Sequence, residues 1–325
     1  MLRDSGCPLT RVSHASGLGP RAARVARDRL QSAPAQILYL EGLRVPAQLF
    51  LAARGMPTRI VARLLYLESN HRLPAVNRWL CRSGRVARIL ADIDPGSLGD
   101  TVAARQLRHK LTIVPSGHDP DWYPMSYELA AFGIPPGAFS VAAVCDGAEH
   151  PGMTRLIECV RDLPMDLPIH FLLLAPERAH ERLRRLIRKH PFTQRFHLSE
   201  LRGGAPGLLA CCSVIVVTAW EMEIQRRACM QGLVAGVPIV AETSAPLEQL
   251  IRSGEDGELL PRGDTQALAH RLFELYESPE RRARLRSGAF RLAERVPPID
   301  RVVDASAGVF RRILSGDLSG ERKPS

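Results

Sequence analysis

The chain has 325 residues, of which 45% are hydrophobic and 24% are charged, so it is long enough for two globular domains and too apolar for wholesale disorder. Its 44 Lys and Arg residues outnumber its 34 Asp and Glu residues, and the formal net charge of +10 favours anionic partners, although a GC-rich genome that prefers Arg codons explains the same excess. Only 5% of the residues are aromatic, which leaves few stacking surfaces for single-stranded nucleic acid, and we expect no nucleic-acid partner.

Signals for export, membrane insertion and metal binding are weak. The N-terminal stretch MLRDSGCPLT lacks the apolar core of a secretory signal, and the longest apolar run, residues 208–220, is too short to span a bilayer. Seven cysteines without a CxxC pair indicate neither a disulfide framework nor a zinc site, and none of the ten histidines has a metal-binding spacing. We therefore expect a cytoplasmic protein without a metal ion or other cofactor.

The first half of the chain alternates between short apolar runs and amphipathic segments. The pattern predicts helices at 21–32, 46–54, 74–82 and 101–108, and strands at 37–40, 59–65, 86–91 and 111–114. Strands alternating with helices at this spacing indicate parallel βαβ units. The next stretch, residues 116–139, is rich in Pro, Gly and aromatic residues, and we interpret it as a linker between domains.

A second alternation follows the linker. It predicts strands at 140–145, 169–174, 195–198, 214–217 and 239–241, and helices at 154–162, 177–189, 205–210, 265–277, 279–296 and 301–314. The stretch ACMQGLVAGVPIVAETSAPLEQLI (228–251) contains a helix, a Gly-x-Pro turn, a buried strand and a further helix start, which is one αβα step of a doubly wound sheet. The fold class is therefore α/β, with two Rossmann-like doubly wound domains.

Residues 110–296 resemble the large family 4 of retaining glycosyltransferases, which have the GT-B fold. The resemblance is carried by the hinge sequence LTIVPSGHDPDWYP, by Leu156-Ile157-Glu158, and above all by residues 234–285, which begin VAGVPIVAETSAPLEQLI. It implies a GT-B arrangement with an interdomain cleft. The expected parts are an N-terminal acceptor-side domain with the hinge (1–136), a C-terminal domain that binds a nucleotide-sugar (137–296), and a crossing helix with a frayed tail (297–325).

The same resemblance assigns two donor-binding residues. In the family, the helix before the Gly-x-Pro turn carries a glutamate that faces the donor sugar and a second one that binds the ribose. These positions fall on Glu223 and Gln231. A carboxylate accepts both hydrogen bonds of a vicinal diol, whereas the Gln amide accepts from one hydroxyl and donates to the other, without charge assistance.

The expected diphosphate site differs more strongly from the family pattern. The positions of the family's Arg and Lys, which neutralise the diphosphate, are occupied by Asp146 and Pro151, and Ile224-Gln225-Arg226-Arg227 replaces a Gly-rich loop. Arg226 and Arg227 stand near the start of a helix, where anions bind favourably, so they are our candidates for the diphosphate. Alternatively, both Arg side chains are solvated or pair with neighbouring glutamates.

Asp146 and three further residues are candidates for lining the cleft. Gly17 and Gly19 fit G-x-G-x-x-A, and Glu41 follows where a dinucleotide-binding enzyme needs an acid, which leaves an NAD-type oxidoreductase as an alternative. We interpret the two glycines as the first N-domain loop of the GT-B fold instead. His71 in the loop SNHRLP is either an acceptor-side polar group or an ordinary surface histidine.

We expect a glycosyltransferase that moves a sugar from a nucleotide-sugar donor to an unknown acceptor, such as a surface glycan or a lipid-linked glycan. The competing interpretation is a catalytically inactive relative kept for binding or as a scaffold. The basic segment 178–190 either lies on an anionic membrane or covers one face of the sheet with its charges in solvent. The expected partners are thus the donor, the glycan acceptor and an anionic membrane.

Overall fold

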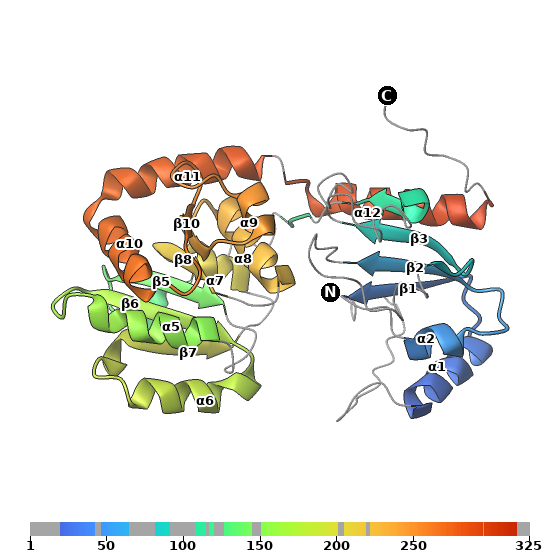
Figure 1. Ribbon diagram of the computed structural model, residues 1–325, viewed down its shortest axis with the longest axis horizontal. Helices are drawn as coiled ribbons and strands as arrows, with labels where there is room; N and C mark the ends of the chain where they lie inside the picture. The colour runs from blue at the N-terminus through green and yellow to red at the C-terminus, as the bar shows by residue number, and fades with distance from the viewer. Residues whose placement is uncertain are drawn as a thin grey trace. The chain divides into compact units, whose positions relative to one another are not determined.

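The computed structural model of the chain describes residues 20–42, 47–64, 82–91, 108–114, 117–119, 127–144, 151–200, 205–218, 222–294 and 296–316. The fold consists of two compact units, shown in Figure 1, and each is described by itself. Unit 1 comprises Met1–Pro115 and Asp300–Ser325, and unit 2 comprises Ser116–Ile299. Among the described helices, none is both long enough and apolar enough to cross a membrane.

Unit 1 contains a parallel sheet whose four strands follow chain order. These are β1 (Ile37–Gly42), β2 (Arg59–Leu64), β3 (Val86–Ala91) and β4 (Leu111–Ile113). Apolar residues in the middle of the sheet, for example Ile60, Val61 and Ile89, are inaccessible to solvent. Because Ile60 and Val61 are consecutive and point to opposite faces, β2 is covered on both faces.

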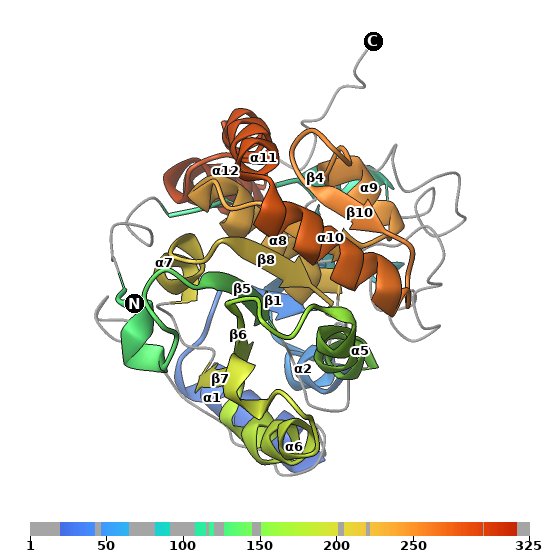
Figure 2. The same cartoon turned by 90° about the vertical axis from the view of Figure 1, so that its left-hand side faces the viewer.

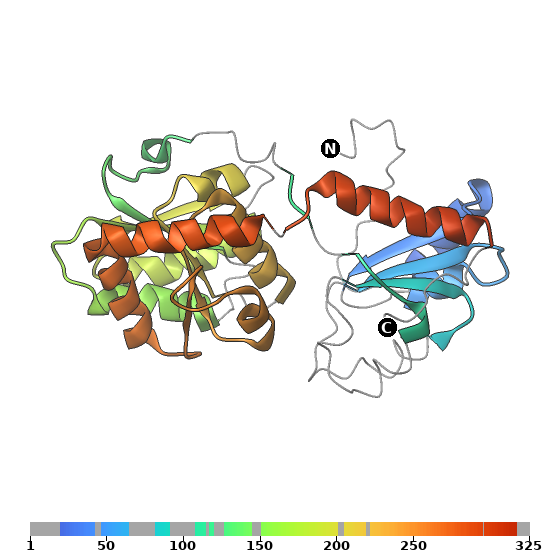
Figure 3. The same ribbon diagram turned by 90° about the horizontal axis from the view of Figure 1, so that it is seen from above.

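Three helices and one short 3-10 turn complete the described part of unit 1. They are α1 (Pro20–Ser32), α2 (Ala47–Ala52), η2 (Arg108–Lys110) and α12 (Ile299–Leu314). Helix α12 comes from the end of the chain and runs beside the strands of this sheet (Figure 3). Its Phe310 ring meets Tyr39 of β1 edge to face, with the ring centroids 5.7 Å apart.

Unit 2 contains a six-stranded sheet with the order β10-β9-β8-β5-β6-β7, in which every neighbouring pair is parallel. The strands are β5 (Phe139–Val144), β6 (Ile169–Ala175), β7 (Phe196–Glu200), β8 (Val214–Val217), β9 (Ile239–Glu242) and β10 (Glu258–Leu260). From β5 the chain first builds outward through β6 to β7 and then returns to add β8, β9 and β10 on the other side. The strand order therefore reverses between β5 and β8, as in a doubly wound Rossmann sheet.

Helices cover both faces of this sheet. They are α5 (Pro151–Cys159), α6 (Glu177–Arg188), α7 (Ala205–Ala210), α8 (Met222–Ala235), α9 (Ala245–Leu250), α10 (Thr265–Glu277) and α11 (Pro279–Ala293), with 3-10 turns η4 (Leu129–Phe132), η5 (Val160–Asp162) and η6 (Thr193–Arg195). Helices α5, α6 and α10 share one core with the sheet, and α7, α8 and α9 share the core on its other face (Figure 2).

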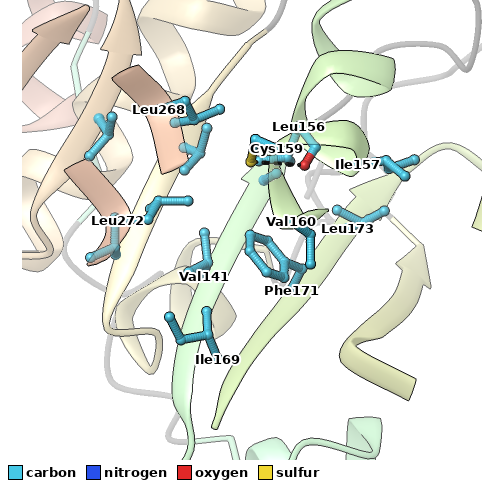
Figure 4. Packing of buried hydrophobic residues seen from close by; sticks show 14 of the residues in the cluster. Val141, Leu156, Ile157, Cys159, Val160, Ile169, Phe171, Leu173, Leu268 and Leu272 are labelled. Carbon is cyan, nitrogen blue, oxygen red and sulfur yellow. Dashed lines mark hydrogen bonds between the residues drawn. The ribbon is translucent and has the colours of Figure 1, made fainter. Parts of the chain in front are cut away.

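The first of these cores is built where α5 and α10 meet over the sheet. Figure 4 shows side chains of β5, β6, α5 and α10 converging there, among them Val141, Phe171, Leu156 and Leu272, and all four are fully buried. Alternating residues of the same strands, such as Ala142 and Leu172, point into the second core. The central strands are thus buried on both faces.

The chain enters and leaves unit 2 at neighbouring points. The backbone N–H of His118 donates to the carbonyl of Pro297 at 3.1 Å, and the N–H of Ile299 donates to the carbonyl of His118 at 2.7 Å. Residues 116–136, which we expected to form part of the N-terminal domain, belong to the same compact unit as the second sheet, and residues from Asp300 belong to unit 1.

The predicted α/β class with parallel sheets is confirmed. The reversal of strand order is seen in the second sheet, whereas the four described strands of the first follow one another in sequence. Two expectations differ from the structure. Strand β10 was not predicted, and residues 224–227, expected as a loop, are helical because α8 already begins at Met222. No Gly or Pro interrupts Ile224-Gln225-Arg226-Arg227, so nothing in this stretch opposes a helix. Of the helices predicted at 74–82 and 101–108, all residues but the last of each lie outside the described residues; Arg82 is helical and Arg108 begins η2.

Candidate functional site

The reversal of strand order places a candidate site in unit 2. In open α/β sheets, ligands bind outside the carboxyl ends of the strands, at the point where the strand order reverses. Here that point lies between β5, which ends at Val144, and β8, which ends at Val217. The helices that follow these strands, α5 and α8, begin at Pro151 and Met222.

An ion pair joins two elements at this edge. Arg155 of α5 donates from Nε to Oε1 of Glu242 at 3.0 Å, and from Nη2 to Oε1 and Oε2 of the same carboxylate at 2.6 and 2.9 Å. Glu242 is the last residue of β9, and its Oε1 also accepts from the backbone N–H of Gly263 at 3.3 Å. The two side chains are 22% and 16% exposed, so the pair is largely screened from water yet still reachable from it.

The ion pair lies on the rim of a small hollow at the carboxyl ends of β8, β9 and β10. The lining includes Thr218, which directly follows β8 and is 3% exposed, and Asp264, whose carboxylate caps α10 by accepting from Ala267 N–H at 2.8 Å. The free volume of about 10 Å³ has room for no more than about one water molecule. This hollow is therefore a structural gap beside the edge and is too small to hold a ligand itself.

Helix α8 carries the predicted donor-binding residues. Glu223 falls in its first turn, and Arg226 and Arg227 fall in its second turn, so both Arg lie farther into the helix than expected. Gln231 is half-buried on the same helix. The neighbouring Gly232 is required by packing, because a Cβ there would stand 2.9 Å from the side chain of Ile215 and 3.1 Å from that of Ile239. This close approach fixes α8 against β8 and β9.

Of the other predicted site residues, some belong to described elements and some lie outside the described residues. Pro151 is the first residue of α5, at the edge described above. Gly17, Gly19, His71 and Asp146 lie outside the described residues, as do the ends of several connecting loops. Glu41, which entered the dinucleotide-binding alternative, belongs to β1, and the strand continues to Gly42.

Sequence reasoning missed Arg155 and Glu242. A signal was available for Glu242, because it directly follows the buried run Ile239-Val240-Ala241 and therefore had to stand at the carboxyl end of a strand. No comparable signal marked Arg155, which lies in a helix with several other charged residues nearby. Its partner is 87 residues further along the chain.

Unit 2 as described is a parallel, doubly wound α/β domain of the Rossmann-like class, with polar groups at the end where nucleotides bind in such folds. Comparison with known families agrees with this assignment. Residues 139–278 match the family model described as "Glycosyl transferases group 1". This range begins at the first residue of β5 and ends just after α10.

A curated relative matches a similar part of the chain. It is the "Putative colanic acid biosynthesis glycosyltransferase WcaL" of Salmonella typhimurium, and it is 29% identical over 157 residues. The aligned stretch makes up 45% of this chain and spans 37% of the length of the relative.

Solved structures match over nearly the whole chain. A glycosyltransferase from Rickettsia africae has a TM-score of 0.72 at 13% identity, with 94% of this chain and 84% of that one covered. Anabaena Alr3699/HepE in complex with UDP-glucose has a TM-score of 0.69 at 18% identity, with 90% and 81% covered. The chain therefore has the fold of GT-B glycosyltransferases, with two Rossmann-like domains.

Proposed function

We propose that this protein is a glycosyltransferase that transfers a sugar from a nucleotide-sugar donor to a glycan acceptor. The observation that carries the proposal is that the residues matched by the family model are the residues that form the sheet of unit 2. The family-model match covers residues 139–278, and those residues build the sheet whose strand order reverses between β5 and β8. The fold likeness to Alr3699/HepE, whose structure holds UDP-glucose, supports a nucleoside-diphosphate sugar as the donor class.

The donor contacts proposed for this chain lie on α8. Glu223 contacts the donor sugar, Gln231 contacts the ribose, and Arg226 and Arg227 neutralise the diphosphate. We further propose retention of configuration and transfer of a hexose, in line with the family 4 resemblance. We assign no side-chain nucleophile, because retaining members of that family have no agreed one.

The acceptor is proposed to be a surface glycan or a lipid-linked glycan, and the WcaL similarity favours a polysaccharide pathway. A lipid-linked acceptor would place the protein at the cytoplasmic face of the membrane. Helix α6 is suited to that location, because it buries Ala179, Leu183 and Ile187 and leaves its cationic side exposed. The exposed cations on and just after the helix are Arg178, Arg182, Arg184, Arg185, Arg188 and Lys189.

The donor proposal is tested by isothermal titration of nucleoside diphosphates and nucleotide-sugars into the purified full chain, with NAD⁺ in the same panel. We expect one nucleotide-sugar to bind, and the Arg226→Ala/Arg227→Ala variant to lose about tenfold or more in affinity. A turnover assay with that donor follows.

The same titration decides between the alternatives. Binding of no nucleotide at millimolar concentration would contradict the transferase and leave the inactive scaffold. Binding of NAD⁺ alone would favour the oxidoreductase instead.

A further inference from the structure

The guanidinium of Arg155 is only partly used by its ion pair. Its Nε and Nη2 donate to Glu242, whereas Nη1 makes no hydrogen bond with the part of the chain that the structure describes. Nη1 carries two N–H donors, and the side chain is 22% exposed. A guanidinium that is oriented by a carboxylate on one edge and keeps unused donors on the other can bind an anion.

The location of Arg155 points to the anion that it would meet. Helix α5 follows β5, and Arg155 reaches from this helix to the last residue of β9. It also lines the same hollow as Thr218, the residue directly after β8. Arg155 therefore lies at the carboxyl edge of the sheet, beside the reversal between β5 and β8. Pro151, the first residue of α5, is four residues before Arg155, so the two residues share one face of the helix. Arg155 therefore lies one turn after the start of α5.

We propose that Arg155 binds the donor diphosphate through Nη1 and that Glu242 is the positioning residue that orients its guanidinium. This inference rests on the proposed function and adds a phosphate-binding cation that does not come from α8. Glu242 acts in two ways. Its bidentate contact fixes the plane of the guanidinium, and its negative charge weakens the attraction of the site for phosphate.

A purely structural role makes a different prediction. If the ion pair did no more than fasten α5 to β9, its loss would disturb the edge of the sheet and weaken every part of the nucleotide alike. A phosphate contact weakens the binding of a nucleoside diphosphate and leaves the binding of the matching nucleoside unchanged. The ratio of these two affinities therefore separates the roles.

The test is a calorimetric titration of UDP, GDP and ADP, and of uridine, guanosine and adenosine, into the full chain and its variants. For the base that binds best, we expect Arg155→Met to weaken diphosphate binding by about tenfold or more and nucleoside binding by less than about twofold. Arg155→Lys should retain part of the affinity. Arg252→Met is the matched control, because Arg252 also pairs with a glutamate in unit 2, at 3.7 Å from Glu255, but is exposed.

Glu242→Gln tests the inference independently, so a folding defect in the Arg155 variants would not leave it untested. Gln retains an acceptor for the guanidinium and removes the negative charge, so we expect diphosphate binding to tighten about threefold at unchanged nucleoside affinity. Equal weakening of diphosphate and nucleoside by Arg155→Met, or weaker diphosphate binding by Glu242→Gln, would overturn the inference alone. If the wild-type chain binds no nucleotide, the proposed function fails and the inference fails with it.

Discussion

His170 on β6 and His197 on β7 face each other, with 2.9 Å between Nδ1 of His170 and Nε2 of His197. His197 is also hydrogen-bonded to the backbone of Phe132, the last residue of η4. The pair thus links two strands to the segment that leads into β5. Burial lowers the pKa of both imidazoles, and that of His170 is lowered further by His197 and Arg195.

The first prediction concerns pH. Both histidines have a lower pKa in the folded chain than the usual 6.5, so the unfolded chain binds more protons as the pH falls. Their contribution to the free energy of unfolding is complete above about pH 6.5 and is lost as the pH falls through the lowered pKa values. Thermal melts between about pH 8 and about pH 5 should show the melting temperature falling on acidification, and less steeply for His170→Gln/His197→Gln. A variant with the wild-type slope would contradict this, and exposed His270→Gln is the control.

The second prediction concerns Glu258, the first residue of β10, which is 3% exposed. Its carboxylate accepts from Arg281 Nη2 at 2.7 Å and Nε at 3.0 Å, and Arg271 lies at 3.4 Å. Glu258→Ala removes the buried carboxylate that both Arg side chains share and leaves them Glu274, and should lower the free energy of unfolding by about 2 kcal/mol.

Urea denaturation measures this change. Glu255→Ala is the control, because it removes an exposed Arg–Glu pair and should cost less than about 1 kcal/mol. Equal losses in the two variants would show that burial does not strengthen the Glu258 cluster.

The third prediction concerns two glycines in helices. In α11, a Cβ on Gly288 would overlap the carbonyl oxygen of Glu255, because the helix packs directly on the backbone of the turn before β10. Gly288→Ala should destabilise the chain by about 2 kcal/mol or more. In α12, a Cβ on Gly308 would meet nothing within 4 Å, and Gly308→Ala should stabilise the chain by up to about 1 kcal/mol. Differential scanning calorimetry should therefore show shifts of opposite sign, and equal shifts would refute the packing argument.

The fourth prediction follows from the proposed donor site. If Gln231 contacts the ribose, Gln231→Glu restores a charged acceptor and should strengthen binding of the donor nucleotide by about 1 kcal/mol, or about fivefold. Titration of the nucleoside and of its diphosphate measures this gain, which should appear for both. The control Gln266→Glu adds the same charge at an exposed position of α10 and should change neither affinity.

Most of the fold was predictable because the strands of unit 2 are buried on both faces and read as apolar runs. Val214–Val217 is the clearest example, since all four residues are buried. Strand β10 escaped prediction because it has three residues and begins with Glu258, whose burial depends on Arg residues from two later helices. From the sequence alone, a charged residue at the start of so short a strand predicts a loop, because its ion-pair partners cannot be identified.

The candidate site was predictable to a smaller extent. Glu223 and Gln231 stay predictions, which rest on the distance from the Gly-x-Pro turn that the family pattern fixes. The pairing of Arg155 with Glu242 was not predicted, because no local pattern joins residues of α5 to the end of β9. Such pairs become visible when the parallel sheet brings the ends of distant strands to one edge.

The order of the two units along the chain has a consequence for biosynthesis. Unit 2 is an insertion in the sequence of unit 1, whose sheet is made early and whose helix α12 is made last. During translation, unit 2 leaves the ribosome before α12 does. Unit 2 can therefore fold while unit 1 still lacks its last helix. Unit 1 is completed only when α12 is made and Phe310 contacts Tyr39. A stop codon before α12 would therefore damage unit 1, whose synthesis began first, and leave unit 2 whole.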